Sequence, residues 1–163
     1  MSVIRQLVAA ASALALLATA SAAGTSFRIE IGSTAALGMD KKFKNSPKKL
    51  VVAVRAVVCG DLATVKITGT AEGLVNGTRR SLPITLTAVD PAEAVYAIAQ
   101  QWPQEGAWVL HLKGSCSTPK ADASTLVAVA RGTFIRDRSQ VLRDPATKKQ
   151  IEEAVAMLAR SHS

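Results

Sequence analysis

Apolar and polar residues alternate along most of residues 26–135, and this pattern predicts β-strands. In residues 26–31 the apolar side chains of Phe27, Ile29 and Ile31 share one face, with the period of two that marks a half-buried strand. Residues 50–59 are almost continuously apolar, which is typical of a central strand, and Arg55 interrupts one face. Similar segments lie at residues 63–71, 82–87, 106–113 and 125–135. About seven strands at this spacing predict an all-β fold, an Ig-like antiparallel β-sandwich.

Turn residues between these segments predict how some strands are joined. Gly60 and Asp61 separate two apolar runs, so we expect them to form the turn of a hairpin. Asn76-Gly77 is the strongest short hairpin signal in the chain. Pro83 has no amide hydrogen to donate, which predicts an edge strand or the start of a strand.

Residues 92–101 fit two structures. Asp90, Pro91 and Glu93 form a helix-start pattern, and the alanine-rich stretch that follows suits a helix. The same stretch also alternates as a strand. We favour the strand, because the short turn at 103–106 would then pair it with the next apolar run.

The C-terminal segment, residues 141–163, predicts an α-helix. Asp144-Pro145 is expected to open it, and it runs to about Arg160. The side chains that form one apolar stripe are Ile151, Ala154, Val155 and Leu158. Such a stripe either packs on the chain's own sandwich, which we favour, or is presented to a partner.

Residues 1–23 have the pattern of a secretory signal peptide. Arg5 precedes an apolar run over Leu7–Ala20, and small residues follow it, so cleavage is expected near Ala22–Gly24. This run of 14 residues is too short to span a membrane as a helix, and no later run approaches about 18 residues. The sequence therefore predicts a periplasmic or secreted protein with a sandwich domain over residues 24–140 and no transmembrane segment after signal removal.

Two cysteines, Cys59 and Cys116, lie 57 positions apart. In an exported domain of this size such a pair is expected to form a disulfide. A redox-active pair is the alternative, but a Cys-x-x-Cys spacing, which would activate a thiol, does not occur.

The chain carries a formal net charge of +8, and 48% of its residues are hydrophobic, which is a globular composition. Five lysines gather around Phe43 and Pro47, and these are Lys41, Lys42, Lys44, Lys48 and Lys49. Such a cluster attracts anionic polymers or lipid headgroups, although a solvated loop is the simpler interpretation. Nucleic acid is not an expected partner of an exported chain that lacks a known nucleic-acid-binding module.

Residues suited to metal binding or catalysis are few. In the alternation of its strand, His111 lies on the outer face, opposite Trp108, Leu110 and Leu112. Copper and zinc sites need several convergent His, Cys or Met ligands, so we expect no metal site and no cofactor. None of the common hydrolase, protease or phosphate-binding motifs occurs, and we expect no enzymatic activity and no catalytic residues.

Trp102 and Trp108 flank the turn at 103–106. The favoured interpretation places Trp108 in the core and Trp102 over the turn. The alternative makes them a small aromatic binding surface for a peptide or a glycan.

The stretch Tyr96–Leu112 contains an aromatic strand, a Pro–Gly turn and a Gly-x-Trp-x-Leu strand. It resembles the closing hairpin of small bacterial exported Ig-like domains of the YtkA/FixH type. The resemblance implies an Ig-like sandwich outside the cytoplasmic membrane. Some domains of that architecture bind copper through Met and His, but the matching stretch holds only His111, so metal binding is not implied.

These observations predict a non-catalytic exported module that binds or assists an envelope protein. One alternative is a periplasmic domain that handles copper or zinc. Another is a binder of anionic surfaces or polymers through the lysines of residues 41–49.

Overall fold

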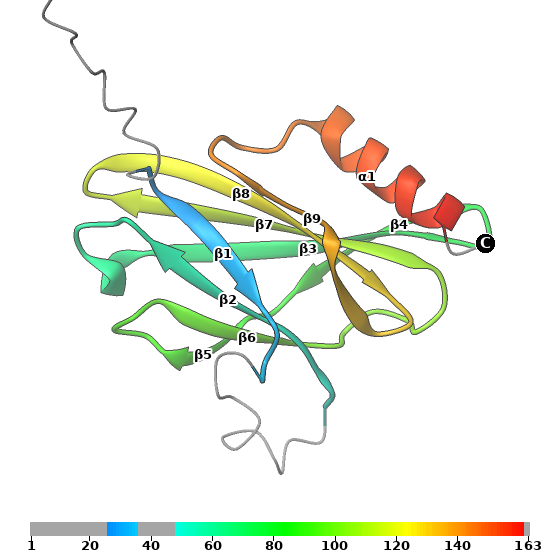
Figure 1. Cartoon of the computed structure of the whole chain (residues 1–163), viewed down its shortest axis with the longest axis horizontal. Coiled ribbons are helices and arrows are strands. Elements are labelled where there is room, and N and C mark those ends of the chain that lie inside the picture. The colour runs from blue at the N-terminus through cyan, green and yellow to red at the C-terminus, as the bar shows by residue number, and fades with distance from the viewer. Residues whose placement is uncertain (1–25, 36–47, 162–163) are drawn as a thin grey trace, which may run out of the picture.

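The structure is a computed structural model that describes residues 26–35 and 48–161. These residues form two antiparallel sheets and a C-terminal helix, so the predicted all-β sandwich with a C-terminal helix is confirmed (Figure 1). The four-stranded sheet has the order β1 (Arg28–Gly32), β2 (Leu50–Val57), β6 (Val95–Ala99), β5 (Thr87–Asp90). The five-stranded sheet has the order β4 (Thr78–Ile84), β3 (Lys66–Val75), β7 (Ala107–Ser117), β8 (Lys120–Ala130), β9 (Thr133–Leu142).

The strand order is that of an immunoglobulin-like domain. The four-stranded sheet corresponds to the strands A-B-E-D of such a domain. In the five-stranded sheet, β4, β3, β7 and β8 correspond to C′-C-F-G, and β9 is an additional strand beyond G. The described residues therefore form nine strands, whereas the sequence predicts about seven.

The core lies between the sheets and uses the inward half of each alternating strand. Ile29, Val52, Leu110 and Val127 are fully buried there. Trp108 is also buried in this layer, and Gly73 of the neighbouring β3 makes room for it. A Cβ atom added to Gly73 would lie 2.4 Å from the indole Cε3. A larger residue at position 73 would therefore force the ring or the strand to move.

Two tight turns join neighbouring strands of the five-stranded sheet. Asn76 and Gly77, with φ of 49° and 75°, connect β3 to β4, which confirms that predicted hairpin. Pro83 lies in β4 at the sheet edge, also as predicted. Arg131 and Gly132, with φ of 49° and 68°, form a second such turn between β8 and β9. The single strand predicted over 125–135 is therefore wrong, because the chain reverses at Arg131.

Two predicted pairings are wrong because the chain crosses from one sheet to the other. The segment containing Gly60-Asp61 leads from β2 in the four-stranded sheet to β3 in the five-stranded sheet, through the short 3-10 helix η1 (Leu62–Thr64). The turn at 103–106 likewise links β6 to β7 in the opposite sheet. The strand interpretation of 92–101 is correct over β6, which pairs with β2 and β5.

The C-terminal helix α1 (Lys148–Ser161) packs on the outer face of the five-stranded sheet. It begins later than the predicted Asp144, because Thr147 and Gln150 cap each other. The Gln150 amide donates to Thr147 Oγ1 at 3.2 Å, and the Thr147 amide donates to Gln150 Oε1 at 2.8 Å. The predicted stripe is confirmed, since Ala154, Val155 and Leu158 are buried. Within the described residues, no helix is both long and apolar enough to span a bilayer.

Candidate functional site

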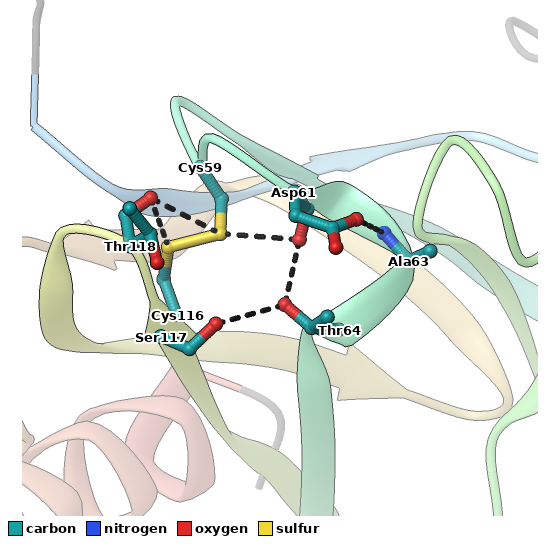
Figure 2. The surroundings of a disulfide bond; sticks show 7 residues. All are labelled: Cys59, Asp61, Ala63, Thr64, Cys116, Ser117 and Thr118. Atoms are coloured by element: carbon teal, nitrogen blue, oxygen red, sulfur yellow. Dashed lines mark hydrogen bonds between the residues drawn. A yellow bond between two sulfur atoms is a disulfide. The ribbon is translucent and has the colours of Figure 1, made fainter.

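A disulfide joins the two sheets at one end of the sandwich. Cys59, just beyond β2, is bonded to Cys116 of β7 with an S–S distance of 2.08 Å, which confirms the predicted pair (Figure 2). Strands β2 and β7 correspond to B and F, the two strands that the disulfide of antibody domains connects. Here the bond lies toward the strand ends rather than in the middle of the sandwich.

The groups around the disulfide hold two loops in place (Figure 2). The carboxylate of Asp61 accepts a hydrogen bond from the Ala63 amide at 3.1 Å, and Thr64 Oγ1 donates to the Asp61 carbonyl at 2.8 Å. The hydroxyls of Thr64 and Ser117 are 3.0 Å apart, and the Gly60 amide donates to the Thr118 carbonyl at 2.7 Å. These contacts cap η1 and attach it to the β7–β8 turn, which is a structural role.

The two tryptophans do not form a binding surface. Trp102 is 4% exposed and Trp108 is 1% exposed, and both belong to the core between the sheets. The Trp108 Nε1–H donates to the Glu105 carbonyl at 2.8 Å, which anchors the turn before β7 to the core. The aromatic surface considered from the sequence is therefore wrong, and the core interpretation of Trp108 is correct.

Of the predicted lysine cluster, Lys41, Lys42 and Lys44 lie outside the described residues. Lys48 and Lys49 are exposed and precede β2. The Lys49 carbonyl accepts a hydrogen bond from the Gln100 amide at 3.0 Å, which ties this segment to the end of β6. An anion-binding role of the whole cluster stays a prediction.

His111 lies on the outer face of β7, opposite Trp108 as predicted, but it is only 5% exposed. Its Nε2 is buried without a hydrogen-bond partner. Burial lowers the pKa of His111, and the positive charge of Lys113 lowers it further, while Glu72 acts in the opposite direction. Within residues 26–35 and 48–161, no three His, Cys, Asp or Glu side chains gather closely enough to hold a metal ion.

A pocket of about 600 Å³ lies at the other end of the sandwich from the disulfide, and we call it the end pocket. It is formed by the β3–β4 turn, the segment before β7, the β8–β9 turn and the last turn of α1. Its lining residues are Leu74, Asn76, Gly77, Gln104, Glu105, Gly106, Ala107, Ala130, Arg131 and Ala159. Its lining is mixed: Leu74, Ala107, Ala130 and Ala159 contribute apolar groups, and the exposed side chains of Glu105 and Arg131 bring one negative and one positive charge.

No protein-family model, curated protein or solved structure matches this chain. The end pocket could not be predicted from the sequence, because the turns that form it lie far apart along the chain. One local signal was available, since Arg131-Gly132 has the glycine that a tight turn with positive φ favours. The end pocket is a candidate binding site among the described residues.

Proposed function

We propose that this protein is an exported, non-catalytic binding module that docks an envelope protein through the end pocket. Export is supported by the signal-like residues 1–23 and by the Cys59–Cys116 disulfide, a bond that persists in oxidising compartments. The disulfide holds the scaffold from the opposite end, so it does not obstruct the pocket.

The shape of the end pocket is the observation that carries this proposal. Among its polar lining residues, Leu74, Ala107 and Ala130 offer apolar contacts to one aliphatic or aromatic side chain of a partner protein. The negative charge of Glu105 and the positive charge of Arg131 would pair with a cation and an anion of the partner that flank this side chain. Loops at the ends of Ig-like sandwiches are common binding surfaces, because a rigid scaffold positions them.

Photo-crosslinking in intact cells tests the proposal. A photoreactive amino acid at Gln104 lies in the pocket lining, whereas the same group at exposed Thr87 lies on the other sheet and serves as the control. We expect position 104 to capture one dominant envelope protein that position 87 does not. Equal capture from both positions, or none from position 104, would contradict the proposal.

An Arg131→Asn variant gives a second readout on the same pocket. Arg131 has a φ of 49°, a conformation that asparagine adopts more readily than arginine, so the variant is expected to remain folded. It removes the rim cation, and capture from position 104 should fall while the melting temperature stays the same or rises. Unchanged capture would exclude Arg131 from the interface.

A further inference from the structure

The outer face of the five-stranded sheet is divided into an apolar half and a polar half. The apolar half lies toward the end pocket, where Val109, Leu126 and Ala128 pack against α1. Beyond His111 the outward positions of β3, β7 and β8 become polar, and they are Lys66, Thr68, Lys113, Ser115, Asp122 and Ser124. These residues line a cavity of about 390 Å³, bounded by Pro145 of the segment that leads to α1. We call this cavity the sheet groove.

The strand register places the two lysines of the sheet groove beside each other. Lys66 pairs with Ser115, and Thr68 pairs with Lys113, so the lysines are diagonal neighbours on adjacent strands. Diagonal neighbours are about 7–8 Å apart at the backbone, a separation that long side chains can close around one small ligand. Both lysines are exposed.

The charges in the sheet groove are not satisfied by one another. Within the described ranges, no salt bridge involves Lys66, Lys113 or Asp122. Asp122 is diagonal to Lys113 on the β8 side, since Ser124 pairs with Lys113 and Ser115 with Asp122.

The walls of the groove are held in place by the fold. Ser124 is fully buried, and its Oγ accepts a hydrogen bond from the Ala146 amide at 3.0 Å, which fixes the segment containing Pro145. Thr68 lies opposite Lys113 in the strand register and Ser115 lies opposite Lys66, so both hydroxyl-bearing residues line the groove next to a lysine. Neighbouring cations repel each other, and a shared anion would relieve that repulsion.

We propose that the sheet groove binds a tetrahedral oxyanion, namely a phosphate or sulfate group carried by an ester ligand. Lys66 and Lys113 supply two point charges, and lysine side chains commonly bind phosphate groups in this way. The hydroxyls of Thr68 and Ser115 donate to the remaining oxygens, and Asp122 can accept a hydrogen bond from a hydroxyl of the ligand. This site is separate from the end pocket, so it does not depend on the function proposed above.

Titration with inorganic phosphate, followed by amide NMR at constant ionic strength, tests the proposal. We expect saturable shifts centred on residues 113–115. A Lys113→Met variant should weaken binding roughly tenfold or more, because a charge-assisted contact is lost. Lys120→Met removes the same charge from the same hairpin but lies outside the groove lining, and it should bind as the native protein does. Asp122→Asn should bind phosphate more tightly, because a repulsive charge is removed.

Shifts that do not saturate, or that saturate in the Lys113→Met variant with the native dissociation constant, would overturn the proposal, as would equal losses of affinity in the two lysine variants. Preferential binding of acetate over phosphate would overturn the tetrahedral geometry. Binding measurements with methyl phosphate and with vesicles that contain an anionic phospholipid then distinguish a soluble phosphate ester from a lipid headgroup. Binding to methyl phosphate indicates a soluble ester, and binding to the vesicles alone indicates a lipid headgroup.

Discussion

His111 shows how one side chain is placed by a strand and then buried by its neighbours. Alternation along β7 puts it on the outer face, and this could be predicted from the sequence. Its burial could not be predicted, because it depends on the flanking strands β3 and β8, where Thr70 and Leu126 pair with it. The imidazole Nε2 has no hydrogen-bond partner there, so protonation would add an unpaired charge close to Lys113.

This environment predicts a pH-dependent stability. The pKa of His111 is lowered in the folded state relative to the ordinary value of 6.5, so the unfolded chain takes up a proton first as the pH falls. We expect the free energy of unfolding to be highest above pH 6.5 and to decline below it. A His111→Leu variant should lose this slope, measured by urea unfolding between about pH 7 and pH 5.

Two carboxylates also have lowered pKa values, but they affect stability in a lower pH range than His111 does. Burial raises the pKa of Glu30, but hydrogen bonds from Arg28 and Arg55 outweigh it, and a hydrogen bond from Arg79 lowers the pKa of Glu152. Their contributions are lost only as the pH falls below 4.5, their ordinary value. A slope above pH 5 that persists in the His111→Leu variant would contradict the assignment to His111.

Helix α1 is attached to the five-stranded sheet both by apolar packing and by a charged contact. Arg79 of β4 donates three hydrogen bonds to Glu152, from Nε to Oε1 at 3.2 Å and Oε2 at 3.1 Å and from Nη2 to Oε1 at 2.9 Å, and its Nη2 also donates to Glu72. The apolar stripe was visible in the sequence because its period is local. The start of the helix was misplaced, although Thr147 and Gln150 carry the capping signal that sets it.

A pair of adjacent residues tests how much the helix packing stabilises the fold. Leu158 is 2% exposed against the sheet, whereas Met157 is 43% exposed. Leu158→Ala should lower the free energy of unfolding by about 2–5 kcal/mol, because it leaves a cavity. Met157→Ala should change it by less than about 0.5 kcal/mol. Equal effects in chemical denaturation would show that α1 does not pack through this stripe.

At the scale of the whole molecule, the disulfide closes a long loop that contains β3, β4, β5, β6 and most of β7. Cys59 and Cys116 are 57 residues apart, so the bond removes many conformations from the unfolded chain. The Ig-like strand order lets this one bond connect the two sheets.

Removing the bond should therefore destabilise the protein as a unit. A double variant, Cys59→Ser with Cys116→Ser, is expected to lose about 2–5 kcal/mol of unfolding free energy. Reductant should lower the melting temperature of the native protein toward that of the double variant, and should leave the double variant unchanged. A native melting temperature that does not respond to reductant, once free thiols are confirmed, would contradict this role.

The sequence by itself located strands β1, β2, β6 and β7, the Asn76-Gly77 turn, the helical stripe and the cysteine pair, because each depends on spacing along the chain. Only the tertiary structure decided which sheet each strand joins, since an alternating pattern specifies a buried face but not a neighbour. For this reason the predicted pairings of β2 with β3 and of β6 with β7 were wrong. The end pocket and the sheet groove were likewise decided by the tertiary structure, because their residues meet only through turns and strand register.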